Sequence, residues 1–286
     1  MIITFGKIYF YWIYNIMRIQ SINTNFSYIV SKKNSPSFGS TDRFYVREDG
    51  KEIGNNTWLF REDLPWHELA EFEIGHFKDK EKVNIIQFAS SDGSEGYTKI
   101  ISLLENPKRK NVDKFFPIQA YDIDNYIVHK AQGGEIALSE RDFYRLANNS
   151  ISLSKYFSRI ATSYDDYLYD VYRRDILSEK QAVTLPGNFN VSDNLRDKIV
   201  FQLGDMFEIL PKIKDNSNTI LMCRNILGYF ADNDAKIEEF VQTAGKVLKR
   251  GSLFTIGKID TTFTNIESLL NKNNFLKMMN NVFLKI

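Results

Sequence analysis

Short apolar runs alternate with amphipathic segments through the middle of the chain. Val83 to Phe88 has the length and apolar content of a buried strand, and Glu95 to Leu104 follows it with helical spacing. The same order returns with a strand at Phe115 to Tyr121 and a helix at Asn125 to Ala131. Two strands joined through a helix form a βαβ unit, whose strands run parallel.

The alternation continues in the C-terminal half. Lys198 to Gln202, Thr219 to Met222 and Ser252 to Gly257 are predicted as further strands, and Asp234 to Lys249 carries its apolar residues on one helical face. This order predicts an α/β fold with a Rossmann-like, doubly wound and mainly parallel sheet. We expect Asn281 to Ile286 to add a late edge strand.

Two segments interrupt the pattern. Asn34 to Gly54 is rich in Ser, Pro, Gly and charges, which is typical of a linker. We therefore predict a short, helical N-terminal region with its linker at 1–54 and a main domain at 55–286. Within that domain, about 139–190 is predicted as a helical insertion crowded with tyrosines, which either pack the insertion onto the domain or form a contact surface.

Composition narrows the class of protein. Among 286 residues, 37 basic and 36 acidic residues nearly cancel, so no overall field favours nucleic acid as a partner. Cys223 is the single cysteine, and His67, His76 and His129 are scattered. These counts exclude an internal disulfide and favour a reducing, cytoplasmic location, and they predict no metal site.

The first 17 residues are rich in Ile, Phe, Tyr and Trp, as in a signal peptide or membrane anchor. Lys7 interrupts this run and Arg18 ends it before about 20 apolar residues accumulate. We therefore expect a packed N-terminal helix.

Polar groups follow two of the predicted strands. Thr219 to Met222 leads directly into Cys223-Arg224-Asn225 and then Tyr229, and Val83 to Phe88 leads into a turn of small residues. In open α/β sheets, ligands bind beyond the carboxyl ends of the strands. An arginine, an amide and a phenol at such an end predict a binding site.

Three residues have both a functional and a structural interpretation. Asp122 ends the second strand, where doubly wound folds hold a ribose, while Asp124 suits the N-cap of the following helix. Arg61 by itself would pair with Glu62 or Asp63 at the surface. Cys223 is expected to be a small buried residue and not a nucleophile.

Four segments follow one another in a family-like order. They are Thr57-x-x-Phe60-Arg61, Ala89-Ser90-Ser91-x-Gly93-x-Glu95-x-Tyr97, Asp122-Ile123-Asp124 and Cys223-Arg224-Asn225-x-Leu227-x-Tyr229-Phe230. In this order they resemble the CheR-type chemotaxis receptor methyltransferases. The resemblance covers about Asn56 to Ile286, and implies a fold of the class I methyltransferase type.

The resemblance implies that S-adenosylmethionine is the cofactor and that the acceptor is a glutamate carboxylate on a protein, in this family a membrane chemoreceptor. S-adenosylhomocysteine would be the product. Arg61, Arg224 and Tyr229 would be the catalytic residues. Together with Thr57 they would lie around the methyl group and the incoming carboxylate, which the arginines would hold. The implied cofactor-binding residues are Thr57, Arg61, Ala89, Gly93, Glu95, Asp122, Asp205, Met206 and Asn225. Among these, Ala89 and Glu95 would hold the methionine part, Asp122 the ribose, and Asp205 with Met206 would lie by the adenine.

The chain departs from the family pattern in three places. The turn has Gly93-Ser94-Glu95-Gly96-Tyr97 where the family has Gly-Glu-Glu-Pro-Tyr, and Gly257-Lys258-Ile259-Asp260 replaces a Ser-Glu segment. The predicted helical insertion replaces a small β-subdomain. Two alternatives therefore stay open, namely a cofactor-binding regulatory or scaffolding module with little catalysis, and a methyltransferase for a small carboxylic acid.

Overall fold

The computed structural model describes residues 44–46, 52–54, 57–160, 187–213 and 218–286. The chain divides into two compact units, residues 1–37 and 38–286, and every described residue belongs to the second. The packed helix expected within the first 17 residues lies outside the described residues, and the domain boundary at residue 54 stays a prediction. No helix in the described part is long and apolar enough to cross a membrane.

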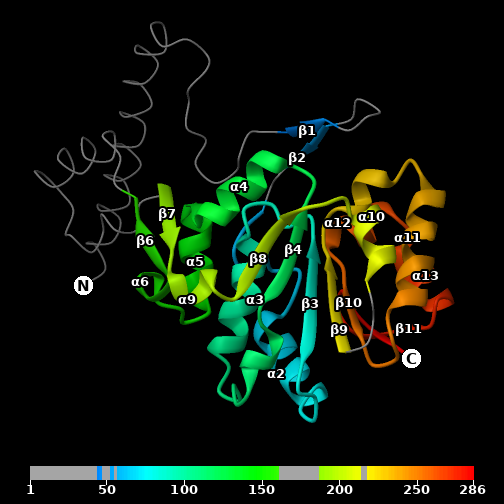
Figure 1. The fold of residues 1–286 in the computed structure, drawn as a ribbon, viewed down its shortest axis with the longest axis horizontal. Coiled ribbons are helices and arrows are strands. Elements are labelled where there is room, and N and C mark those ends of the chain that lie inside the picture. Colours follow the sequence, from blue (N-terminus) through cyan, green and yellow to red (C-terminus); the bar gives the residue numbers. More distant parts are fainter. Residues whose placement is uncertain (1–43, 47–51, 55–56, 161–186, 214–217) are drawn as a thin grey trace, which may run out of the picture. The chain divides into compact units, whose positions relative to one another are not determined.

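A seven-stranded sheet forms the centre of the second unit (Figure 1). Its strand order is β11-β12-β10-β9-β3-β4-β8, and β12 runs in the direction opposite to the other six strands. The strands are β3 (Val83–Phe88), β4 (Ile118–Asp122), β8 (Ile199–Leu203), β9 (Asn218–Cys223), β10 (Leu253–Thr255), β11 (Phe275–Met279) and β12 (Val282–Lys285). This order gives a Rossmann-like α/β fold of the class I methyltransferase type.

The strand order reverses between β3 and β9. From β3 the chain moves outward through β4 to β8, and then returns to the other side of β3 to build β9 and β10. A reversal of this kind leaves a crevice at the carboxyl ends of the two central strands, where ligands bind. The predicted turn after Phe88 and the predicted site after Met222 therefore meet at this crevice.

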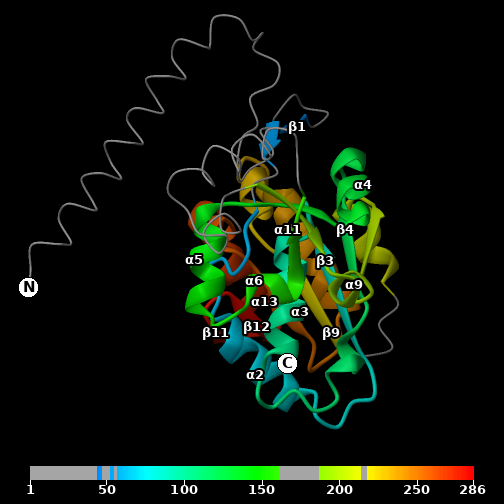
Figure 2. The same cartoon turned by 90° about the vertical axis from the view of Figure 1, so that its left-hand side faces the viewer.

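Helices cover both faces of the sheet (Figures 1 and 2). Alternate residues of β3 point to opposite faces, so that Val83 and Ile85 join one core while Ile86 and Phe88 join the other. The first core packs against α2 (Trp66–His76), α3 (Ser94–Leu104) and α4 (Asn125–Gly133). The second packs against α11 (Asp234–Val247) and α13 (Ile266–Lys272), and α12 (Lys258–Phe263) precedes α13.

Local sequence signals set several helix ends. The Asp124 carboxylate accepts the Tyr126 N–H at 3.0 Å and so caps α4, which ends at Gly134 with a φ of 74°. Ser139 and Asp142 form a capping box that begins α5. The remaining helices are α5 (Glu140–Asn148), α6 (Leu153–Tyr156), α9 (Asp193–Arg196), α10 (Met206–Ile209), and the 3₁₀ turns η1 (Val112–Phe115), η2 (Leu210–Lys212) and η3 (Leu227–Phe230).

Two smaller sheets complete the described structure. A hairpin pairs β1 (Phe44–Val46) with β2 (Glu52–Gly54). An antiparallel sheet of order β5-β7-β6 consists of β5 (Glu135–Leu138), β6 (Phe157–Arg159) and β7 (Gly187–Val191). The predicted insertion thus contains helices α5 and α6 but also two strands that the sequence did not indicate, and its residues 161–186, with four tyrosines, lie outside the described residues.

One strand prediction is wrong in its position. We expected Asn281 to Ile286 at an edge of the sheet, but β12 lies between β10 and β11, and β11 forms the edge. The hairpin of β11 and β12 docks through its second strand, because Leu253 to Thr255 pair with β12. Sequence analysis also left α2, α12, α13 and β11 unpredicted.

Candidate functional site

The turn between β3 and α3 has an unusual backbone. Ala89, Ser91 and Gly93 have φ angles of 52°, 49° and 91°, all in the left-handed region. A side chain at Gly93 would place its Cβ 2.5 Å from the Phe201 ring. Asp92 stabilises the turn by accepting the Ser94 N–H at 3.0 Å and hydroxyl at 2.6 Å. The turn therefore needs glycine at position 93.

Asp122 lies beside this turn. One carboxylate oxygen accepts the Ser91 N–H at 2.8 Å, and the other accepts the Asp124 N–H at 3.0 Å. Burial raises the pKa of this carboxyl group above its ordinary range. Each oxygen keeps a second lone pair, so Asp122 can still accept a hydrogen bond from a ligand hydroxyl. The structure also confirms that Asp124 caps the helix.

Four buried charged side chains meet at the crevice, and we call them the ion-pair cluster. Arg224 contacts Asp63 Oδ1 through Nη2 at 2.5 Å and Glu95 Oε1 through Nη1 at 3.0 Å. Arg61 Nε lies 3.5 Å from the same Glu95 oxygen. No side chain of the four is more than 11% exposed, so these contacts are little screened by solvent.

Two tryptophans support the arginines. The Arg224 guanidinium carbon lies 4.8 Å from the centre of the Trp66 ring, and the Arg61 carbon lies 4.6 Å from that of Trp58. The Trp66 indole N–H donates to the carbonyl of Arg61 at 2.9 Å. The loop before α2 and the segment after β9 are therefore connected by the contact of the Trp66 ring with Arg224 as well as by the ion pair of Asp63 with Arg224.

Arg61 is therefore not a surface residue, and the interpretation in which it pairs at the surface is wrong. Glu62 instead makes a bidentate pair with Arg145, at 2.7 and 2.5 Å. The Arg145 guanidinium holds the pKa of Glu62 below its ordinary value.

Asp260 fixes the segment that carries Arg224. Its buried carboxylate accepts backbone N–H groups of Asn225 at 2.7 Å, Gly257 at 2.7 Å and Gly228 at 3.1 Å. Asn225 has a φ of 57°, and its side-chain oxygen accepts the Ile259 N–H at 3.1 Å. These contacts supply a physical reason for the carboxylate in the segment 257–260.

Other predicted site residues lie after β8, at or after the end of β9, and before α2. Asp205 caps α10 by accepting the Phe207 N–H at 2.8 Å, and buried Met206 lies with its sulfur 4.0 Å from that of Cys223. Tyr229 on η3 and Thr57 before Arg61 are half-buried. Cys223 is fully buried, and burial raises the pKa of its thiol well above the ordinary value, in agreement with a structural residue.

The structure thus brings Arg61, Glu95 and Arg224 into direct contact. It adds two residues that sequence analysis missed, Asp63 and Asp260. The only signal for Asp63 in the sequence was its place two residues after Arg61. The only signal for Asp260 was that its segment, 257–260, replaces the Ser-Glu segment of the family.

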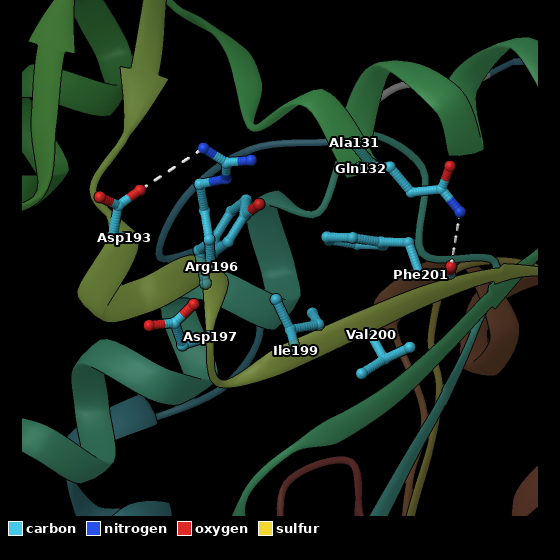
Figure 3. A pocket seen from close by; sticks show the side chains of 9 residues that line it. Ala131, Gln132, Asp193, Arg196, Asp197, Ile199, Val200 and Phe201 are labelled. Atoms are coloured by element: carbon cyan, nitrogen blue, oxygen red, sulfur yellow. Dashed lines mark hydrogen bonds and ion pairs between the residues drawn. The ribbon is translucent and has the colours of Figure 1, made fainter.

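A separate cavity of about 370 Å³ lies between α3, α4, α9 and β8 (Figure 3). At its rim, Arg196 pairs with Asp193 at 3.5 Å and the Gln132 amide donates to the Phe201 carbonyl at 2.9 Å. We place the candidate site at the ion-pair cluster because the cavity contains no predicted site residue. Its lining residues are Tyr97, Ala131, Gln132, Asp193, Arg196, Asp197, Ile199, Val200 and Phe201.

The groups at the crevice match those of S-adenosylmethionine. A carboxylate at Glu95 suits an ammonium group, a guanidinium at Arg61 suits a carboxylate, and Asp122 suits ribose hydroxyls. The Ser90 hydroxyl in the turn is buried without a hydrogen-bond partner among the described residues, which leaves it available to a ligand. The donor set therefore fits the cofactor.

The sheet defines a Rossmann-like α/β fold, and the groups at the crevice fit S-adenosylmethionine as a ligand. Residues 55–165 match the family model of the CheR methyltransferase, SAM binding domain. Residues 55–165 are thus similar to the S-adenosylmethionine-binding domain of CheR methyltransferases, and this match indicates S-adenosylmethionine as the cofactor. A search of curated proteins returns no significant match.

Solved structures similar to this chain include two methyltransferases. A S-adenosylmethionine-dependent methyltransferase from Clostridium acetobutylicum is 10% identical over 69% of this chain and 52% of its own, with a TM-score of 0.29. Human N-acetylserotonin methyltransferase in complex with SAM is 12% identical over 75% of this chain and 49% of its own, with a TM-score of 0.32. This chain thus spans about half the length of each. At such low sequence identities and TM-scores, these two structures give no information on the substrate or the mechanism of this chain.

Proposed function

We propose that this protein transfers a methyl group from S-adenosylmethionine to a glutamate carboxylate of a partner protein. The observation that carries the proposal is the contact of 3.0 Å between Arg224 and Glu95. It joins the arginine assigned to the acceptor with the carboxylate assigned to the cofactor, at the point where the strand order reverses.

When bound, S-adenosylmethionine supplies an electrophilic methyl group on a sulfonium. The ordinary pKa of a glutamate side chain is about 4.3, so an acceptor carboxylate is ionised at neutral pH and needs no general base. Arg224 then acts by positioning, since a guanidinium holds a carboxylate through directed N–H bonds. The CheR resemblance assigns Tyr229 and Arg61 to the same site. The absence of a histidine from this set of residues is consistent with that chemistry.

The partner and location are part of the proposal. The acceptor is a protein that presents a carboxylate, for which the CheR resemblance suggests a chemoreceptor-like membrane protein and a role in chemotaxis. The protein would act in the cytoplasm without nucleic acid or metal.

Calorimetric titration with S-adenosylhomocysteine tests the cofactor site. We expect saturable one-to-one binding that weakens at least about tenfold in Asp122→Asn, which removes the charge but retains the shape. Glu140→Gln, an exposed carboxylate at the start of α5, is the matched control. Equal affinity in all three proteins would remove Asp122 from the site.

Methyl transfer is tested with Arg224→Lys and labelled cofactor, scored as base-labile methyl ester on membrane or cytoplasmic protein fractions of the native cell. We expect loss of label with cofactor affinity retained. Full activity of the variant would contradict the role of Arg224.

A regulatory or scaffolding module is the second candidate. The observation in its favour is that both terminal nitrogens of Arg224 already contact carboxylates of the chain itself. Such a module would bind S-adenosylhomocysteine but would show neither cofactor hydrolysis nor automethylation at high protein concentration.

A further inference from the structure

Asp63 places a carboxylate of the chain itself on the arginine assigned to the acceptor. Its Oδ1 lies 2.5 Å from Arg224 Nη2, and the two side chains are 6% and 1% exposed. The other oxygen accepts the Lys258 N–H at 2.9 Å. Asp63 therefore offers Arg224 the same chemical group as the proposed acceptor.

Asp63 is held in this position from several sides. Besides the contact with Lys258, its carbonyl accepts the Asn281 amide N–H at 3.0 Å. Asn281 is itself buried and lies in the turn between β11 and β12. Since both the side chain and the backbone of Asp63 are bound, its negative charge is a fixed part of the crevice.

The ion-pair cluster consequently has no surplus positive charge. Arg61 and Arg224 contribute two guanidinium groups, and Asp63 and Glu95 contribute two carboxylates. An approaching carboxylate meets attraction from Arg224 and repulsion from Asp63 at nearly the same place, and in a buried site neither is strongly screened.

We propose that Asp63 is a specificity-determining residue that excludes small free carboxylic acids from the acceptor position. A small acid has only its charge with which to bind Arg224, and Asp63 cancels that attraction. A carboxylate on a protein adds contacts from the rest of the partner surface, which can outweigh the repulsion. This inference rests on the proposed function and selects a protein acceptor over the alternative of a small acid.

The test measures acetate binding to the full chain without cofactor. Trp66 packs against Arg224, so its indole N–H signal in a ¹⁵N–¹H spectrum, assigned with Trp66→Phe, reports on an anion at Arg224. Acetate is titrated into the wild type, Asp63→Asn, Asp63→Ser and Glu62→Gln. The last variant makes the same charge change on the neighbouring residue, whose exposed side chain pairs with Arg145.

We expect both Asp63 variants to bind acetate at least about tenfold more tightly than the wild type, and Glu62→Gln to match the wild type. The gain should disappear when Arg224→Lys is combined with Asp63→Asn. Unchanged or weaker acetate binding in folded Asp63 variants would overturn the proposal and leave Asp63 as a residue that only orients Arg224. Because the cofactor is not added, this result is independent of S-adenosylhomocysteine binding and of methyl transfer, on which the proposed function stands.

Discussion

The Asp260 carboxylate accepts the Asn225 N–H at 2.7 Å and so ties the start of α12 to the residue that follows Arg224. Asn225 is in the left-handed region, and that conformation needs support from its surroundings. Asp260 provides the support without reaching the ligand crevice itself. It is therefore a positioning residue for Arg224.

Asp260→Ala is expected to lower stability and to release the segment after β9. A buried hydrogen bond to a charged group contributes roughly 1.5–3 kcal/mol, and three N–H donors lose their partner, so a loss of at least about 3 kcal/mol is expected. Urea unfolding measures it, with Glu239→Gln on the exposed side of α11 as the control. A loss below about 1 kcal/mol would show that water replaces the carboxylate.

Asp92 predicts a specific dependence of stability on pH. Burial raises its pKa to about 6 from an ordinary value of 3.8, against the lowering effect of its bonds to Ser94. The folded protein therefore holds a proton that the unfolded chain has released between these two values. The stability from this group is fully present below pH 3.8 and is lost as the pH rises through about 6.

The difference in unfolding free energy between the wild type and Asp92→Asn isolates that effect. It should fall by about 3 kcal/mol between pH 3.8 and pH 7, because each pKa unit corresponds to about 1.36 kcal/mol. Denaturant titrations at several pH values give the curve. A difference that stays flat across this range would mean that the Asp92 pKa is not raised.

Lys99 and Glu73 form a buried ion pair between α3 and α2, with side chains 2% and 0% exposed. Burial lowers the pKa of the lysine and raises that of the glutamate, although each is partly opposed by the other. Removing one partner leaves an uncompensated charge, so Lys99→Met or Glu73→Leu is expected to cost about 3–5 kcal/mol.

The double variant Lys99→Met with Glu73→Leu should be much closer to the wild type, because apolar side chains of similar volume satisfy a buried site. Guanidinium unfolding of all four proteins completes a double-mutant cycle. Additive losses in the double variant would contradict a direct interaction.

Gly93 and Gly75 offer a matched pair of substitutions. Gly93→Ala places a Cβ against the Phe201 ring at a φ of 91°, and the two effects are expected to cost about 2 kcal/mol or more. Gly75 is an exposed position of α2 with nothing within 4 Å of an added Cβ, so Gly75→Ala should gain up to about 1 kcal/mol from helix propensity. Thermal melting measures both, and a stable Gly93→Ala protein would show that the turn can change its backbone.

The sequence predicted β3 and β9 well because nearly every residue of these two strands is buried. β3 has the predicted bounds, Val83–Phe88, and the predicted turn and Asp122 lie at the ends of β3 and β4. The sequence pattern could not predict the position of β12, because a four-residue strand with three apolar residues fits an edge of the sheet as well as its interior. Its place depends on pairing with β10, which lies earlier in the chain.

The contacts that complete the candidate site could not be predicted from the sequence either, because they join residues that lie far apart in the chain. Asp63 and Arg224 are separated by 161 positions, and Asp260 and Asn225 by 35. No local pattern marks either carboxylate, since an Asp near an Arg in sequence usually pairs at the surface.

The glycine at position 96 could also be explained only from the structure. A Cβ there would lie 2.5 Å from Ile199 and 2.8 Å from Gln87, which explains a glycine at the family's proline position.

The order of strands across the sheet has a consequence for biosynthesis. β11 leaves the ribosome before β12 but joins the sheet only through it, and the turn between them holds the carbonyl of Asp63. A nascent chain that has not yet released residue 285 can assemble the turn after β3, but it lacks the support for the loop that faces Arg224. The acceptor side of the crevice is therefore complete only after the hairpin of β11 and β12 has been synthesised.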